Sequence, residues 1–328
     1  MPLPTDAIIG LMVDNLRTRG SVFPISISST TKWARGLGIP HGGRSVIYTG
    51  HMYQLVPYIN ASVANLERFE DSFLGQFVFL ARYANRLFNI SRLMAIPSKA
   101  DVAEYNEIMR SIALLLIEAG VEFGYLYESE RYAGALAHDM GANEVFEEHA
   151  RNVYSVLKGN GVENVITVDP HTTNMLRSVY ATVIEGYDIG VKSYLEVLAE
   201  KDMKPARVMD ADVVIHDSCV YARYEDVVEE PRRLLEKAGY RIKEPRDSKG
   251  LAHCCGGPVE SLYPKVANRI GEKRVRQLTD AGGHTAALMC PICLATLKKA
   301  ASPEIEIVDI ASLLAKAYCS GHSNGGMC

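Results

Sequence analysis

The sequence predicts an α/β protein with two similar lobes, each built on a mainly parallel sheet flanked by helices. Short apolar runs alternate with amphipathic helical stretches, which is typical of parallel strands joined by helices. The order strand, turn, helix and strand also occurs twice along the chain, as expected for a duplicated fold with a pseudo-two-fold axis. The 328 residues, 48% of them hydrophobic, are enough to fill two cores.

The first half is expected to consist of an arm over residues 1–45 and a lobe over residues 46–205. Trp33, the only tryptophan, is expected to pack the arm onto the lobe. The predicted strands cover 45–50, 121–127 and 164–168, and the predicted helices cover 54–67 and 143–158.

A helical insertion at about 62–110 is the main difference expected between the two lobes. Aromatic side chains recur in it at helical spacing, so that several of them share one helix face. These residues are Phe69, Phe73, Phe77, Phe79, Tyr83 and Phe88. The aromatic stripe is either ordinary core or a docking surface for a partner subunit.

The second half is expected to form a lobe over residues 206–318 and a mobile, Gly- and Ser-rich tail over residues 319–328. The predicted strands cover 212–215, 240–242, 284–289 and 306–309, and the predicted helices cover 229–238 and 259–281. The tail holds Cys319 and Cys328. The terminal cysteine is either an inert thiol or a group on a flexible arm that reaches a partner.

The composition argues against nucleic-acid-binding and membrane-spanning proteins. The formal net charge is −4, so no basic excess favours nucleic acid or an anionic membrane surface. No apolar run approaches the roughly 20 residues that a membrane-spanning helix needs. The start lacks the basic and apolar parts of a secretory signal, and we expect a cytoplasmic protein.

Five of the seven cysteines form one spaced pattern, C-x34-CC-x34-CPxC. The members of this five-cysteine site are Cys219, Cys254, Cys255, Cys290 and Cys293. Neighbouring side chains on a strand point to opposite faces, so the adjacent pair can face one object only where the backbone turns sharply. Gly256 and Gly257 permit such a turn. Because parallel strands end at one edge of a sheet, the five thiols are expected to converge there.

The chemistry of the five-cysteine site has three interpretations. Structural zinc takes four ligands, usually from paired CxxC turns, and fits five thiols poorly. A disulfide between Cys254 and Cys255 would be a strained redox bridge. An iron–sulfur cluster, which is held by cysteine thiolates, fits the pattern best. The odd cysteine count points the same way, since thiols stay reduced in the cytoplasm.

Three residues beside the five-cysteine site are candidates for catalytic roles. His216 and His253 flank cysteines of the site, where they either hydrogen-bond a sulfur atom and carry a proton to a thiolate, or only order the loops. Arg223 is a candidate to offset the charge of an anionic cluster or to hold a substrate carboxylate or sulfonate.

The repeat pairs the five-cysteine site with a site in the first half that has lost its cysteines. The matched segments are Val46–Tyr53 with Val213–Tyr221, Arg131–Ala135 with His253–Gly257, and Val165–Thr172 with Thr285–Cys293. His51, Asp169 and His171 take the places of lost ligands. With His138 nearby, this region is a decayed site refilled with polar residues, a substrate-binding site, or a site for a single metal ion.

The cysteine pattern resembles the CCG, or cysteine-rich, domain family, which includes the B-type and D-type subunits of heterodisulfide reductase. The same domain occurs in DsrK and in the iron–sulfur subunit of glycolate oxidase. The likeness includes the motif His-Asp-x-Cys-x-x-x-Arg-Tyr from His216 to Tyr224, the Trp33 arm and the degenerate first copy, and so covers most of the chain. It implies two CCG-type lobes and a noncubane [4Fe-4S] cluster held by the five-cysteine site, at which a disulfide is cleaved one electron at a time.

The chain departs from this family in two ways. It has one complete motif where relatives usually carry two, and it lacks the ferredoxin-type run C-x2-C-x2-C-x3-C-P. The resemblance therefore implies electrons from a separate ferredoxin-like iron–sulfur subunit (C-type), with a flavoprotein subunit (A-type) and a second B-type subunit as further partners. The implied substrate is a sulfur-containing small molecule or a thiol carrier, and partners would bring the protein to a membrane surface.

The resemblance thus predicts an oxidoreductase subunit of a heterodisulfide reductase-like complex that works on thiols, disulfides or other sulfur compounds. Two alternatives stay open. One is a non-catalytic electron-transfer or scaffold subunit of such a complex. The other is an accessory iron–sulfur subunit of a flavin-dependent glycolate, lactate or glycerol-3-phosphate dehydrogenase.

Overall fold

Two parallel four-stranded sheets form the centres of two lobes in the computed structural model, which describes residues 5–23, 25–70, 96–260 and 262–319. The first sheet contains β1 (Ser45–Tyr48), β2 (Gly124–Tyr125), β3 (Asn164–Thr167) and β4 (Gly190–Ser193), in the order β2-β1-β3-β4. The second contains β5 (Ala211–His216), β6 (Tyr240–Lys243), β7 (Thr285–Leu288) and β8 (Glu306–Asp309), in the order β6-β5-β7-β8. The two orders are the same, which confirms the α/β class and the duplicated lobes.

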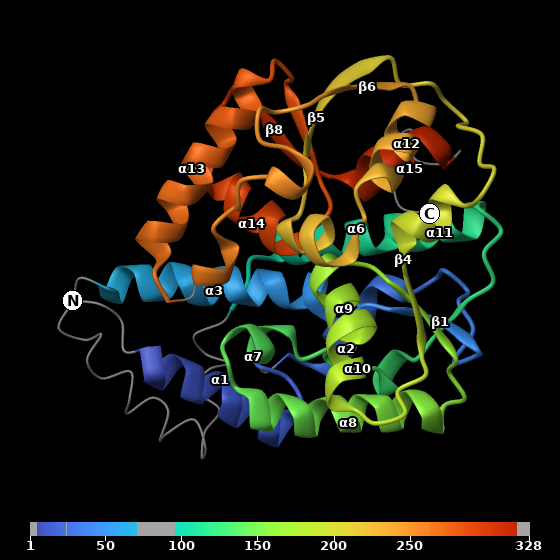
Figure 1. Cartoon of the computed structure of the whole chain (residues 1–328), viewed down its shortest axis with the longest axis vertical. Coiled ribbons are helices and arrows are strands. Elements are labelled where there is room, and N and C mark those ends of the chain that lie inside the picture. Colours follow the sequence, from blue (N-terminus) through green and yellow to red (C-terminus); the bar gives the residue numbers. More distant parts are fainter. Residues whose placement is uncertain (1–4, 24, 71–95, 261, 320–328) are drawn as a thin grey trace.

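Helices cover both sheets and fill the space between the lobes (Figure 1). Those before β5 are α1 (Thr5–Arg19), α2 (Ile27–Thr30), α3 (Met52–Glu70), α6 (Lys99–Glu118), α7 (Ala135–Asp139), α8 (Asn143–Gly159), α9 (Pro170–Asn174), α10 (Tyr180–Val183) and α11 (Tyr194–Ala199). Those after β5 are α12 (Glu229–Lys237), α13 (Pro264–Asp280), α14 (Pro291–Ala300) and α15 (Ile310–Tyr318). The parallel strands are thus joined by helical crossovers, as the alternating pattern predicts.

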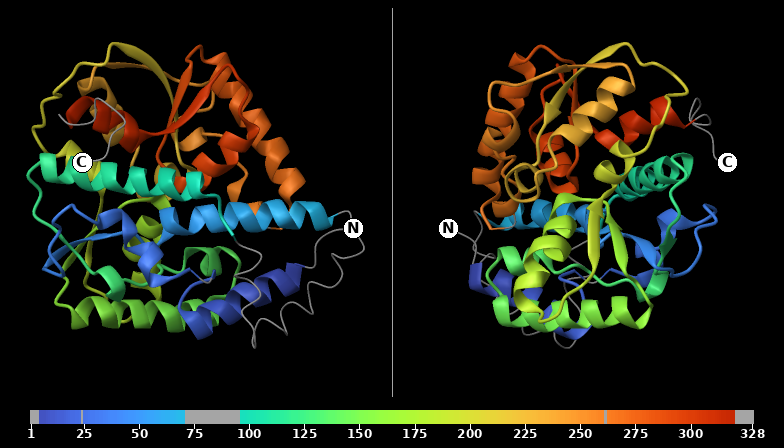
Figure 2. Two further views of the ribbon diagram at one scale, coloured as in Figure 1. Left: turned by 180° about the vertical axis from the view of Figure 1, so that it is seen from behind. Right: turned by 45° about the vertical axis from the view of Figure 1, so that its right-hand side comes forward.

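Helices α3 and α6 run across the middle of the molecule, between the two lobes (Figures 1 and 2). α6 packs on α15, and α3 packs on α14, so both helices join the first half of the chain to the second lobe. The expected insertion at 62–110 begins within α3 and ends within α6. Of the aromatic residues expected to form a stripe, Phe73 to Phe88 lie outside the described residues, as does the side chain of Phe69 in α3.

Strand β4 is missing from the sequence prediction. It is an edge strand, and of its four residues only Ser193 is buried, so it lacks the apolar run that marks an interior strand. The strand expected at 121–127 is also shorter than predicted and reduces to Gly124–Tyr125, at the opposite edge of the same sheet.

Trp33 packs the arm onto the first lobe, as expected. Its side chain is fully buried, and the centroid of its ring lies 4.9 Å from the centroid of the Tyr125 ring. Arg110 of α6 fixes the same turn, because its Nη1 donates hydrogen bonds to the carbonyl oxygens of Trp33 and Arg35 at 2.9 and 2.7 Å.

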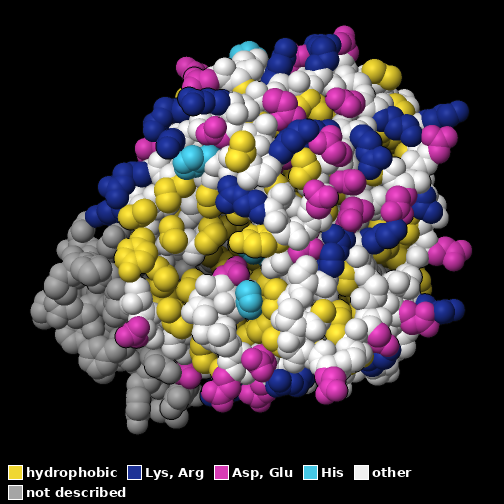
Figure 3. All heavy atoms as spheres, viewed as in Figure 1, with side chains coloured by type: hydrophobic (Ala, Val, Ile, Leu, Met, Phe, Trp, Pro, Cys, Tyr) yellow, Lys and Arg dark blue, Asp and Glu magenta, His cyan; other side chains and the backbone are white. Residues whose placement is uncertain are grey.

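Hydrophobic side chains gather on one face of the molecule, over α3 and the adjoining end of α13 (Figure 3). Val266 of α13 and the nearby Tyr263 are among the exposed large hydrophobic residues. No helix in the described ranges is both long and apolar enough to cross a membrane.

Candidate metal centre

The thiols of the five-cysteine site meet at one edge of the second sheet. β5 and β7 are adjacent and parallel, so the loops after them, which carry Cys219 and Cys290, leave the sheet at the same edge. The thiols are close neighbours in the order Cys219, Cys254, Cys255, Cys293 and Cys290, since each one shifts the pKa of the next. Cys255, Cys290 and Cys293 are at most 3% exposed, whereas Cys219 and Cys254 are partly exposed. The site therefore has a buried inner part and one open side.

The turn after the adjacent cysteines gives each of them a backbone donor. The amide of Gly256 donates to the sulfur of Cys254, and the amide of Gly257 donates to the sulfur of Cys255, both at 3.4 Å. Gly256 makes this possible with a φ of 91°, in the left-handed region. Such N–H···S hydrogen bonds favour thiolates over thiols.

Replacing Gly256 by alanine is expected to disrupt this turn. The added Cβ would lie 2.6 Å from the carbonyl oxygen of Ala267 in α13, so backbone has to move. We expect the variant to lose most of its iron. Gly282→Ala is the matched control, because Gly282 also has a positive φ, 82°, but its Cβ would have no neighbour within 4 Å. Iron analysis of both purified variants tests this, and equal iron contents would contradict it.

His216 presents an N–H group at the five-cysteine site. Arg274, a guanidinium that can only donate, gives its Nε hydrogen to Nδ1 of His216 at 3.0 Å, so the ring proton is on Nε2. Nε2 is buried and has no hydrogen-bond partner among the described residues. One ring nitrogen of His216 lies within 4.8 Å of the sulfurs of Cys255 and Cys293. Burial, assisted by Arg274, lowers the pKa of His216 to about 3, so the ring is neutral.

His253 and Arg223 lie beside the site and make hydrogen bonds with backbone carbonyl groups. Nδ1 of His253 lies 3.0 Å from the carbonyl oxygen of Cys254. Arg223 donates from Nε to the carbonyl oxygen of Gly250 at 3.0 Å and from Nη2 to that of Ala252 at 2.6 Å. These contacts order the loop that leads to the adjacent cysteines. The catalytic roles of both residues stay predictions.

The thiol set fits an iron–sulfur cluster better than a zinc ion. All five sulfurs share one site, which is more than tetrahedral zinc uses. The one group of three metal-ligating residue types found in the described residues is His216, Cys255 and Cys293. Binding zinc through Nε2 of His216 would move its proton to Nδ1 and break the hydrogen bond from Arg274. Cys219, Cys254, Cys255, Cys290 and Cys293 are the residues that would hold a cluster.

The first lobe keeps the backbone of this site without its thiols. The register of the paired strands places Asp169 at the position of Cys290, each two residues after the last paired residue of its strand. It places His51 at the position of Cys219, each three residues after the last paired residue of its strand. In the structure the second-lobe segments therefore start at Val214 and Ala286, one residue later than in the alignment made from the sequence. With these starts, the paired segments of the two lobes have equal lengths and align without a gap. Gly134, with a φ of 87°, takes the place of Gly256. The remaining counterparts are Tyr132, Ala133 and Thr172, whereas His171 takes the place of Ile292 and not, as expected from the sequence, of a lost ligand.

The polar replacements in the first lobe face other groups of the same lobe. Asp169 accepts a hydrogen bond from the amide of Thr172 at 3.0 Å, and so caps α9. His51 has its Nε2 3.8 Å from the carboxylate of Glu130. Among the described residues, His51, Asp169, His171 and His138 belong to no group of three metal-ligating side chains. His51 and Glu130 instead line a cavity of about 370 Å³ under the N-terminal arm.

Glu130 is expected to make stability depend on pH. Burial raises its pKa from 4.5 to about 7, despite hydrogen bonds from Tyr125, Thr49 and Gly50. Between these values Glu130 holds a proton in the folded protein that it has lost in the unfolded chain, so its contribution to the free energy of unfolding falls by about 3 kcal/mol as pH rises from 4.5 to 7. Glu130→Gln should remove this fall. Urea unfolding of iron-free protein checks it, with the exposed Glu128→Gln expected to behave like the parent.

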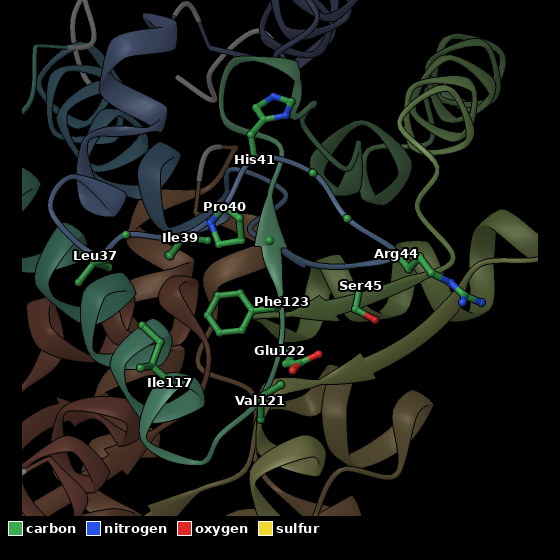
Figure 4. A pocket seen from close by; sticks show the side chains of 14 residues that line it. Leu37, Ile39, Pro40, His41, Arg44, Ser45, Ile117, Val121, Glu122 and Phe123 are labelled. Carbon is green, nitrogen blue, oxygen red and sulfur yellow. The ribbon is translucent and has the colours of Figure 1, made fainter.

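A second cavity lies at the end of the first sheet where strands β1 and β2 begin. It has a volume of about 750 Å³ and is an open groove between the segment 37–45 and the segment 117–124, before β1 and β2 begin (Figure 4). Phe123 and Ile117 form part of its wall. Its lining includes none of the five cysteines or their flanking histidines, so the groove is separate from the five-cysteine site.

Comparison with known proteins agrees with this site. The family model described as a cysteine-rich domain, CCG, matches residues 213–298. The probable iron-sulfur-binding oxidoreductase FadF of Bacillus subtilis is 30% identical over 64% of this chain and 31% of its own length. The EtfAB:quinone oxidoreductase of Syntrophomonas wolfei is 28% identical over 65% of this chain and 32% of its own.

A further relative is the D-type subunit of the dihydromethanophenazine:CoB–CoM heterodisulfide reductase of Methanosarcina acetivorans. It is 26% identical over 74% of this chain and 66% of its own length. The chain spans about a third of the first two relatives, at 31% and 32%. Residues 213–298 are thus a cysteine-rich domain of the CCG type, in a chain that resembles iron–sulfur oxidoreductase subunits.

Proposed function

We propose that this chain is an iron–sulfur redox subunit of a heterodisulfide reductase-like complex. It transfers electrons to or from a thiol, a disulfide or another sulfur compound at a noncubane-type [4Fe-4S] cluster in the five-cysteine site. The observation that carries this proposal is the convergence of five thiols with Cys219 and Cys254 on an open side, where an external sulfur atom has access. When bound, the cluster supplies one-electron redox chemistry next to that opening.

The inner part of the site carries a further polar group. The N–H at Nε2 of His216 is a buried donor near Cys255 and Cys293, without a partner in the described part of the chain, and is suited to a sulfur atom that gains negative charge. Arg274 holds it in that tautomer. Reduction of a disulfide takes two electrons and two protons and gives two thiols. The electrons come from a reduced ferredoxin-like iron–sulfur partner and the protons from solvent at the open side.

The names of the relatives support this choice without fixing the substrate. The Methanosarcina relative belongs to a CoB–CoM heterodisulfide reductase, so a thiol–disulfide pair is the first substrate class to test. The partners we propose are a ferredoxin-like subunit, a flavoprotein subunit and a second B-type subunit. We further propose a cytoplasmic location, with membrane contact only through these partners.

The test uses protein purified anaerobically and followed by EPR spectroscopy. CoB–CoM heterodisulfide, cystine and 2-mercaptoethanesulfonate are added in turn to the oxidised and the reduced protein. At least one compound should change the cluster signal, and a disulfide should oxidise reduced methyl viologen in the presence of the protein. A cluster signal that none of these compounds alters would rule out the sulfur-redox function.

An electron relay is the second candidate, favoured by the names of FadF and of the EtfAB:quinone oxidoreductase. In that case the five-cysteine site would pass electrons from a flavoprotein to another acceptor, as in an accessory subunit of a flavin-dependent dehydrogenase. Reduction of the cluster by a reduced electron-transferring flavoprotein, together with indifference to all sulfur compounds, would favour this candidate.

A further inference from the structure

The five-cysteine site lies where the two lobes meet, so side chains of the first half of the chain reach it. Tyr53 of α3 donates a hydrogen bond from its hydroxyl to Asp309, at the end of β8, at 2.7 Å. Tyr105 of α6 donates to the carbonyl oxygen of Pro291 at 3.4 Å. Pro291 directly follows Cys290, which is 1% exposed. Side chains of the first half of the chain therefore contact the residue after Cys290 and the end of the neighbouring strand β8.

His171 is a first-lobe residue in contact with a thiol of the site. It lies in the first turn of α9, is 7% exposed, and its ring is close enough to the thiol of Cys290 for each group to shift the pKa of the other. Its Nδ1 lies 3.5 Å from a carboxylate oxygen of Asp139, at the end of α7. With Asp139 at Nδ1, the other ring nitrogen, Nε2, is left for the sulfur.

We propose that His171 is a positioning residue through which the first lobe controls the five-cysteine site, donating a hydrogen bond to the sulfur of Cys290 while Asp139 orients its ring. The inference rests on the proposed function only in requiring that the five cysteines hold a cluster. It does not depend on which compound exchanges electrons there.

The duplicated fold shows why this contact needs the first lobe. Asp169-Pro170-His171 lies where Cys290-Pro291-Ile292 lies in the second lobe, so the equivalent of His171 is an isoleucine that has no side-chain donor. The loss of cysteine at 169 leaves the turn that starts α9, and this turn presents His171 to the intact site across the interface. The degenerate lobe thereby keeps a part in the chemistry of the other lobe.

A hydrogen bond to a ligand sulfur stabilises the reduced form of a cluster, because reduction adds negative charge. Replacing His171 by phenylalanine should therefore make the midpoint potential more negative. We expect about a tenfold lower ratio of reduced to oxidised cluster at a fixed potential, which is about 59 mV for a one-electron couple. His171→Gln keeps an N–H donor and should restore most of the ratio, and Asp139→Asn should give an intermediate value.

The experiment is an EPR-monitored redox titration of the full chain with its cluster, with iron content measured on every variant. Tyr105→Phe is the matched control, since it removes a contact between the lobes beside Cys290 without touching the sulfur, and its potential should equal that of the parent. Full iron content with an unchanged potential in His171→Phe overturns this inference alone. A parent protein without any iron–sulfur cluster overturns the proposed function and the inference together.

A shifted potential in a protein that ignores every sulfur compound would keep the inference and reject the sulfur substrate. If His171→Phe fails to fold, His171→Gln and Asp139→Asn carry the test. In that case both variants are compared at full iron content. A midpoint potential of Asp139→Asn equal to that of the parent would then contradict the orienting role of the carboxylate. If Tyr105→Phe also loses iron, the effect of replacing His171 comes from disturbing the contact between the two lobes and not from losing the hydrogen bond to Cys290.

Discussion

Cys255→Ala is expected to abolish the iron–sulfur cluster. Cys255 lies in the middle of the chain of thiol contacts, between Cys254 and Cys293, and is 2% exposed. Its loss removes, from the buried part of the site, a thiol that would hold the cluster. The parent should carry about four iron ions per chain, as a [4Fe-4S] cluster requires, and the variant less than about one. Iron and acid-labile sulfide analysis with EPR measures both.

The matched control is Cys319→Ala. Cys319 directly follows α15 and takes no part in the thiol contacts of the five-cysteine site, and burial raises the pKa of its thiol to about 11, so it is not a thiolate at neutral pH. This variant should keep its iron, its sulfide and its EPR signal. Full iron in Cys255→Ala would mean that the five thiols are not the ligand set. One zinc ion and no sulfide in the parent, after reconstitution with iron, would make the site structural.

The strand–helix order and the cysteine spacing are readable from the sequence because both depend on local rules. Parallel strands end at one edge, so residues that follow β5 and β7 must meet. The Gly-Gly pair after the adjacent cysteines marks a sharp turn, and Gly256 indeed has a positive φ. The same reasoning locates the counterpart of this turn in the first lobe, at Gly134.

Residues that act across the molecule leave no such signal. Arg274 lies on α13, a helix rich in charged residues, where one more arginine indicates a solvated face, yet its side chain is fully buried against His216. Asp139 and His171 are 32 residues apart, and His171 meets Cys290 only after the two lobes have packed. Such contacts depend on tertiary packing, which periodicity does not report.

Arg232→Met is expected to destabilise the second lobe by about 3–5 kcal/mol, because it leaves a buried carboxylate unpaired. Arg232 of α12 donates from Nη1 and Nη2 to the two carboxylate oxygens of Asp217, at 2.8 and 3.0 Å. The two side chains are 6% and 1% exposed. Asp217 also accepts the amide of Lys249 at 2.6 Å, so it ties the loop of Cys219 to the loop that leads to Cys254. Urea unfolding of iron-free protein measures the loss.

Arg233→Met is the control on the same helix, since Arg233 pairs with Glu230 at 3.0 Å and is 61% exposed. A surface pair contributes at most about 1 kcal/mol, and the control should lose no more than that. Adding Asp217→Asn to Arg232→Met removes the unpaired charge and should recover part of the stability. If the two arginine variants unfold alike, the buried pair does not hold the loops. If the double variant regains stability but still binds less iron, the pair serves the geometry of the cysteines, because the charge is then gone and only the tie between the two loops is missing.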